Sequence, residues 1–78
     1  DGEYEFIEAE ILEKSELLNK SIKDSNLPEH IRIGAVLRSE KVIIPRSDFI
    51  FEKGDLVVFL AKRELLQEVE SIFRLSSI

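Results

Sequence analysis

The clearest structural signal in this chain of 78 residues lies in residues 31–45, which read IRIGAVLRSEKVIIP. Apolar side chains alternate with others along residues 31–38, which is the period of a β-strand with one apolar face. A further strand is predicted over residues 41–45, which begin after only Ser39-Glu40, and so short a gap predicts an antiparallel hairpin. Ser and Glu are poor residues for such a turn, and Pro45 ends the pairing because it has no amide donor.

After the hairpin the sequence predicts a central strand and then a helix. Residues 56–60, LVVFL, are apolar on both faces and follow Gly54, which can adopt the positive φ of a tight turn. We expect this strand to be central and to be covered by another layer on each side. From Glu64 onward the apolar positions recur with the period of an amphipathic helix. They are Leu65, Leu66, Val69, Ile72 and Phe73.

The N-terminal part predicts one further strand. Residues 4–11 alternate between apolar and mostly acidic positions, as in a strand with one wet face. The alternation slips at Phe6-Ile7, and a β-bulge at this point would bring Tyr4 and Phe6 to the same face as residues 7, 9 and 11. We therefore expect a bent first strand.

A short helix is predicted between this strand and the hairpin. Ser21 and Asp24 have the spacing of a capping box, which favours a helix over residues 21–26. Pro28 limits that helix because it disfavours helical geometry in the residue before it. The predicted fold class is α+β, a small β-α-β-β-β-α domain with a mostly antiparallel four-stranded sheet and a C-terminal amphipathic helix on one face.

Length and composition exclude several classes of protein. The chain, residues 1–78, is expected to be one domain excised from a longer polypeptide, because it begins with Asp1-Gly2 and lacks an initiator Met. Without Cys and with a single His, it offers no disulfide framework and no thiolate zinc site. The sequence shows no catalytic triad, no glycine-rich phosphate loop and no diverging pair of carboxylates, so we expect neither an enzyme nor a metal site.

The charge distribution argues against nucleic acid as a partner. Residues 1–16 contain seven acids and one Lys, whereas the other 62 residues contain nine acids and ten bases. The bases are scattered along the chain instead of being clustered, so a basic binding face is not predicted.

Five segments, in this order and spacing, resemble the TrkA C-terminal domain, which is also called the RCK C-terminal domain, over about residues 4–73. The segments are SIKDSNLP (21–28), IRIGAVLR (31–38), VIIPR (42–46), GDLVVF (54–59) and EVESIF (68–73). The last six residues, FRLSSI (73–78), are similar to the extreme C-terminus of Trk potassium uptake regulators.

This resemblance implies a cytoplasmic regulatory domain of potassium transport, held at the inner face of the cell membrane by a transporter or channel subunit. In the family the domain usually follows a Rossmann-type nucleotide-binding domain and commonly forms a homodimer. Some members bind cyclic di-AMP between the two copies. The expected function is therefore to sense a ligand at a dimer interface and to couple its binding to transport gating.

The nucleotide site of the binding members corresponds to residues 31–38 and 42–46. Aliphatic side chains can cover the faces of flat bases, while an arginine binds phosphate. We further expect Arg38→Ala to weaken the binding of an anionic effector while leaving the fold nearly unchanged. The candidate ligand-binding residues are Ile33, Arg38, Ile44, Pro45, Arg46 and His30.

Two alternatives remain open. The chain is either this ligand sensor or a purely structural dimerisation module that binds no small molecule. The same module is also compatible with attachment to an antiporter or another carrier.

Overall fold

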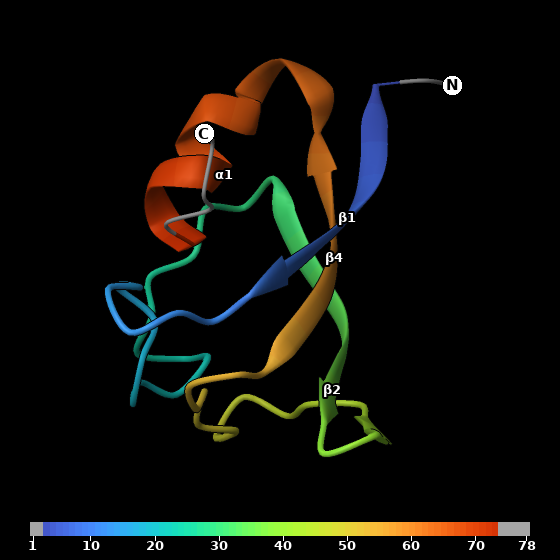
Figure 1. Ribbon diagram of the computed structural model, residues 1–78. Coiled ribbons are helices and arrows are strands. Elements are labelled where there is room, and N and C mark those ends of the chain that lie inside the picture. The colour runs from blue at the N-terminus through green and yellow to red at the C-terminus, as the bar shows by residue number, and fades with distance from the viewer. Residues whose placement is uncertain (1–2, 74–78) are drawn as a thin grey trace.

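The strands form one antiparallel sheet in the computed structural model, which describes residues 3–73 (Figure 1). The order in the sheet is β1-β4-β2-β3, so β4 is central, as predicted. The predicted α+β class is confirmed, because one C-terminal helix packs against this sheet. The elements are β1 (Tyr4–Glu10), β2 (Ile31–Arg38), β3 (Lys41–Ile43), β4 (Leu56–Lys62), the 3-10 helix η1 (Arg63–Leu65) and α1 (Leu66–Phe73).

The core lies between one face of the sheet and α1. Figure 1 shows α1 and the segment that follows β1 on the same side of the strands. The side chains of Phe59 on β4 and Phe73 on α1 are fully buried, and their rings stack with centroids 4.6 Å apart. Ile11 and Leu17, from the segment between β1 and β2, complete the same core.

The opposite face of the sheet has no covering layer among residues 3–73, so the prediction of a layer on each side of β4 is wrong for this part of the chain. Val57, Phe59 and Ala61 are buried, but the alternate residues of β4 keep part of their surface exposed. A continuous apolar run thus gives one buried face and one open apolar face.

The bulge predicted in β1 is also wrong. The seven residues of β1 pair with β4 without any register shift, from Tyr4 opposite Lys62 to Glu10 opposite Leu56. Phe6 pairs with Leu60 and lies on the open face, where 82% of it is exposed. The parity slip in the sequence arises because β1 has apolar residues on both faces.

The irregularity lies in β2 instead. Ile33 pairs with Phe59 and Ala35 pairs with Val58, the next residue to be paired in β4. Gly34 is therefore an extra residue of β2 that has no partner in β4, which makes a β-bulge. The bulge breaks the simple alternation predicted for residues 31–38. Ile33 therefore shares the face of the buried Phe59, whereas Ala35 lies on the open face.

The hairpin between β2 and β3 is confirmed. Ser39 and Glu40 both have positive φ, 51° and 67°, as in the turn type that fits the twist of two-residue hairpins. The strand β3 ends at Ile43, two residues before Pro45, and is shorter than predicted.

The predicted helix over residues 21–26 is absent, and this segment forms turns. The capping bond is present, since the Asp24 amide donates to Ser21 Oγ at 3.2 Å. However, Ser21 also forms an antiparallel bridge with Ile50, and Asn26 has a φ of 54°, which helices do not contain. Backbone pairing with the segment before β4 replaces helical bonds here.

None of the helices in the described part of the chain is long and apolar enough to span a membrane.

Candidate functional site

The most distinctive pocket lies beside the part of β2 that is not paired with β3. The strand β3 pairs only with residues 36–38 of β2, so residues 31–35 lie along an edge that no strand of residues 3–73 covers. The turns of residues 21–27 and the segment that follows β3 approach this edge, and the Lys23 amide donates to the Ser47 carbonyl at 2.9 Å. These parts enclose a pocket of about 530 Å³, lined by Ile22, Lys23, Asn26, Leu27, Ile31, Arg32, Ile33, Pro45, Arg46 and Ser47.

The pocket is basic. Three of its lining residues, Lys23, Arg32 and Arg46, carry a positive charge, and none is acidic. Their side chains take part in none of the ion pairs found within residues 3–73. This local excess of positive charge stands in a chain of net charge −5. The site therefore attracts an anion by its own field.

The rest of the lining is largely apolar. Leu27, Ile33 and Pro45 are partly buried and present hydrocarbon surface to the pocket. Ser47 and the Asn26 amide add neutral hydrogen-bonding groups. A ligand that combines a flat apolar part with phosphate or carboxylate groups matches this lining.

Three of the six residues predicted from the sequence line this pocket: Ile33, Pro45 and Arg46. Sequence reasoning missed Lys23, Arg32 and the neutral groups. A signal for Lys23 was present in the segment SIKDSNLP, but treating residues 21–26 as a helix gave no reason to place it beside Arg46. Only the backbone pairing of the turns with Ser47 and Phe49 brings these cations together.

Arg38 lies outside the pocket lining and is already paired. Its Nε and Nη2 donate to the two carboxylate oxygens of Asp55 at 2.7 and 2.6 Å, and Nη2 also donates to the Ile50 carbonyl at 2.9 Å. The guanidinium also lies 4.7 Å from the ring centroid of Phe49, and Nη1 is 3.4 Å from a carboxylate oxygen of Glu52. The hydrogen bonds to Asp55 are the main cause that raises the pKa of Arg38 above its ordinary value.

This pair has a structural role. The Asp55 side chain is 1% exposed, and it also accepts the Glu52 amide at 2.8 Å. A phosphate could bind Arg38 only by competing with a buried, bidentate carboxylate. The expectation that Arg38→Ala leaves the fold nearly unchanged does not fit this pair, since loss of Arg38 leaves a buried charge without its partner.

His30 and Ile44 also lie outside the lining. His30 precedes β2, and its Nε2 is 3.2 Å from a carboxylate oxygen of Glu68 on α1. Ile44 is 72% exposed, directly after β3. Their predicted contact with ligand has no support from the pocket geometry and stays a prediction.

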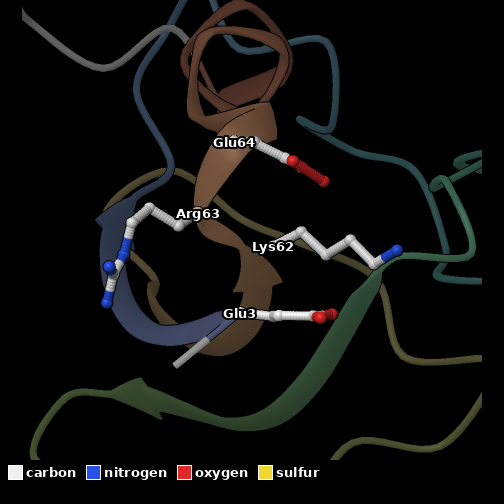
Figure 2. A pocket seen from close by; sticks show the side chains of 4 residues that line it. All are labelled: Glu3, Lys62, Arg63 and Glu64. Atoms are coloured by element: carbon white, nitrogen blue, oxygen red, sulfur yellow. The ribbon is translucent and has the colours of Figure 1, made fainter. Parts of the chain in front are cut away.

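A second pocket, of about 510 Å³, lies at the far end of β4 and is shown in Figure 2. In that view Glu3, Lys62 and Glu64 point to one side, while Arg63 points to the other. Two acids and two bases line it, so their charges cancel and no class of ligand is favoured. No group of three or more metal-ligating side chains occurs in the described ranges.

The fold and the first pocket define a small α+β domain with a basic site at a free sheet edge. Residues 6–74 match the family model of the TrkA-C domain, and the chain belongs to this family.

Relatives in the family are much longer than this chain. The Trk system potassium uptake protein TrkA of Azorhizobium caulinodans is 41% identical over 76 residues, which cover 97% of this chain and 17% of that protein. The protein of the same name from Haemophilus influenzae is 38% identical over 64 residues, which cover 81% of this chain and 14% of that protein. The similarity of residues 73–78 to Trk regulators falls mostly outside the described residues.

Solved structures share the fold. The RCK_C domain dimer of S. agalactiae BusR in complex with c-di-AMP has a TM-score of 0.76 and 26% identity, covering 88% of this chain and 95% of that one. The RCK C domain of the potassium transport protein KtrA, also in complex with c-di-AMP, has a TM-score of 0.74 and 27% identity, covering 87% of this chain and 81% of that one.

Proposed function

We propose that this chain is a cytoplasmic regulatory domain of a potassium transport system, which binds an anionic nucleotide of the c-di-AMP type in the basic pocket. The observation that carries the proposal is the set of three unpaired cations, with no acid among the lining residues, around an apolar site in an acidic chain. The names of the TrkA relatives support the transport system, and the c-di-AMP complexes of BusR and KtrA support the class of ligand.

The cationic and the apolar residues of the pocket bind different parts of the ligand. Lys23 and Arg46 neutralise phosphate, and Arg32 adds a third cation at the edge of β2. Leu27, Ile33 and Pro45 cover the flat face of a base. A cyclic dinucleotide has two bases and two phosphates related by a two-fold axis, so one ligand fits two copies of this site in a homodimer.

Gating follows from a difference in affinity. A bound nucleotide favours the arrangement of the two copies that binds it more tightly, and the effect on a transporter or channel subunit is limited by that difference. In the full-length protein we place this domain after a nucleotide-binding domain and beside the membrane subunit. The site would act in the same way if that partner were an antiporter or another carrier.

Arg46→Ala is expected to raise the Kd for c-di-AMP about tenfold or more, because one charge-assisted hydrogen bond contributes about 1.5–3 kcal/mol. Arg46 is exposed, so thermal stability should stay within about 0.5 kcal/mol of the parent chain. Lys41→Ala, which removes an exposed cation from β3 outside the pocket, is the matched control. Equilibrium dialysis of both variants measures the effect, and an unchanged Kd for Arg46→Ala would remove this residue from the site.

A purely structural dimerisation module is the second candidate, favoured by the open apolar face of the sheet. Ligand binding separates the two candidates because it stabilises only a sensor, by RT ln(1 + [L]/Kd), or about 2.7 kcal/mol at 100 times Kd. For a domain of this size we expect c-di-AMP to raise the Tm by about 10 °C or more, whereas linear di-AMP has a smaller effect. Thermal unfolding followed by circular dichroism gives the answer, and an identical Tm at every nucleotide concentration would favour the structural module.

A further inference from the structure

The outer edge of β1 is a second free edge of the sheet. β1 stands first in the order β1-β4-β2-β3, and no strand of residues 3–73 lies beyond it. All seven residues of β1 pair with β4 in one continuous register, so this edge is regular along its whole length. It thus differs from the free part of β2, where turns approach the edge and enclose the basic pocket.

Two backbone bonds at the ends of the ladder identify the groups that point outward from β1. The Arg63 amide donates to the Glu3 carbonyl, and the Ile11 amide donates to the Asp55 carbonyl, both at 2.8 Å. In an antiparallel ladder every second residue is bonded to the neighbouring strand, so the odd-numbered residues of β1 direct their backbone groups toward β4. The even-numbered residues direct theirs away from the sheet. They are Tyr4, Phe6, Glu8 and Glu10.

This edge is open to pairing but selective in charge. β1 contains no Pro, no Lys and no bulge, which are common features that keep a further strand away from an exposed edge. The side chains of its four outward-pointing residues are all exposed. Glu8 and Glu10 take part in none of the ion pairs within residues 3–73. An added strand therefore meets two unpaired carboxylates followed by two aromatic side chains.

We propose that an extended, basic segment of another protein adds to this edge as a further strand, antiparallel to β1. Its backbone bonds the outward-pointing amides and carbonyls, which supplies affinity, and its alternate side chains face those of the four outward-pointing residues, which supplies specificity. Opposite charges and apolar pairs are the favourable cross-strand neighbours. Read from its N-terminus, the segment thus needs cations opposite Glu10 and Glu8, and then apolar side chains opposite Phe6 and Tyr4.

The charge of this strand argues against a second copy of the chain as the occupant. Residues 1–16 contain seven acids and one Lys, so two copies of β1 side by side bring like charges together. A basic segment gains from the same charges. The proposal uses neither the basic pocket nor a nucleotide, so it stands or falls independently of the proposed function.

Fluorescence anisotropy with a labelled peptide of sequence KTKTVTV tests the proposal on the full 78-residue chain. Its lysines match Glu10 and Glu8, and its valines match Phe6 and Tyr4. We expect saturable binding of this peptide and about tenfold or more weaker binding of ETETVTV, which reverses the charge. A second control peptide, KTKTPTV, keeps both lysines but has no amide opposite Phe6, and it should also bind more weakly.

Variants of the chain test the two carboxylates. Glu8→Lys and Glu10→Lys should each weaken binding of KTKTVTV severalfold, and the double variant should prefer ETETVTV instead. Both side chains are exposed, so the fold should stay intact, which circular dichroism verifies. Glu70→Lys is the matched control, since it makes the same charge change at an exposed position of α1, outside the sheet.

Amide hydrogen exchange followed by nuclear magnetic resonance separates strand addition from a purely electrostatic contact. In the free chain the amides of Phe6 and Glu8 should exchange faster than those of Ile7 and Ala9, which are bonded to β4. Bound KTKTVTV should slow the first pair.

Three results would overturn the proposal. They are the absence of saturable binding, equal affinity for the three peptides, and exchange at Phe6 and Glu8 that the bound peptide leaves unchanged. If these two amides are already protected in the chain alone, and lose that protection on dilution, the edge pairs with a second copy and the proposal is equally wrong.

Discussion

Replacing Phe59 by Ala is expected to lower the free energy of unfolding by about 4 kcal/mol, the cost of truncating a fully buried aromatic side chain. The ring has no exposed surface and stacks on Phe73, with an angle of 6° between the ring planes. This contact links α1, the one α-helix found in residues 3–73, to the central strand. Its loss should therefore loosen α1 as well as the core.

Urea unfolding followed by far-ultraviolet circular dichroism measures this loss, because the chain has no Trp to serve as a fluorescence probe. Ile50→Ala is a suitable control, since it truncates an exposed apolar side chain and should change stability by less than about 1 kcal/mol. A Phe59→Ala variant as stable as this control would contradict the packing of α1 on β4.

Arg38→Ala is expected to lower the free energy of unfolding by about 3 kcal/mol, since removal of one partner leaves a buried charge uncompensated. Asp55 is 1% exposed and receives two hydrogen bonds from Arg38, so its carboxylate loses its only cation within the described chain. The same substitution frees the Ile50 carbonyl, which Arg38 binds at 2.9 Å. Arg38 thus links the end of β2 to the segment before β4 through these hydrogen bonds.

A double-mutant cycle isolates this interaction. The variant Arg38→Ala/Asp55→Ala removes both charges and should be less destabilised than the sum of the two single variants. If urea unfolding shows Arg38→Ala within about 0.5 kcal/mol of the parent chain, then Arg38 is a simple surface residue and the original expectation of an intact fold holds.

Much of the fold could be predicted from local pattern. The hairpin, the central strand and the amphipathic helix each have a period or a turn within a few residues of sequence. The position of the bulge could not, because one slip in alternation is explained equally by a bulge or by a strand that is apolar on both faces. In β1 the second explanation is correct. Phe6 lies exposed on the open face, so β1 has no bulge that would turn it toward the core.

The residues of the candidate site could also be predicted only in part. Ile33, Pro45 and Arg46 could be found from the resemblance to the family because they lie on or directly after one hairpin. Lys23 could not, since its place beside them depends on backbone pairing between two irregular segments. Arg38 shows the opposite error. Its partner Asp55 is 17 residues away, and nothing in the local pattern indicates that the guanidinium is already bound.

Calorimetric titration of the chain with c-di-AMP, with linear di-AMP as the control ligand, tests whether the basic pocket is a nucleotide site. We expect one c-di-AMP to bind per two chains, with affinity lost in Arg46→Ala and retained in Lys41→Ala. No heat at millimolar c-di-AMP, from a chain that is folded and dimeric, would contradict the proposal that the basic pocket is a nucleotide site.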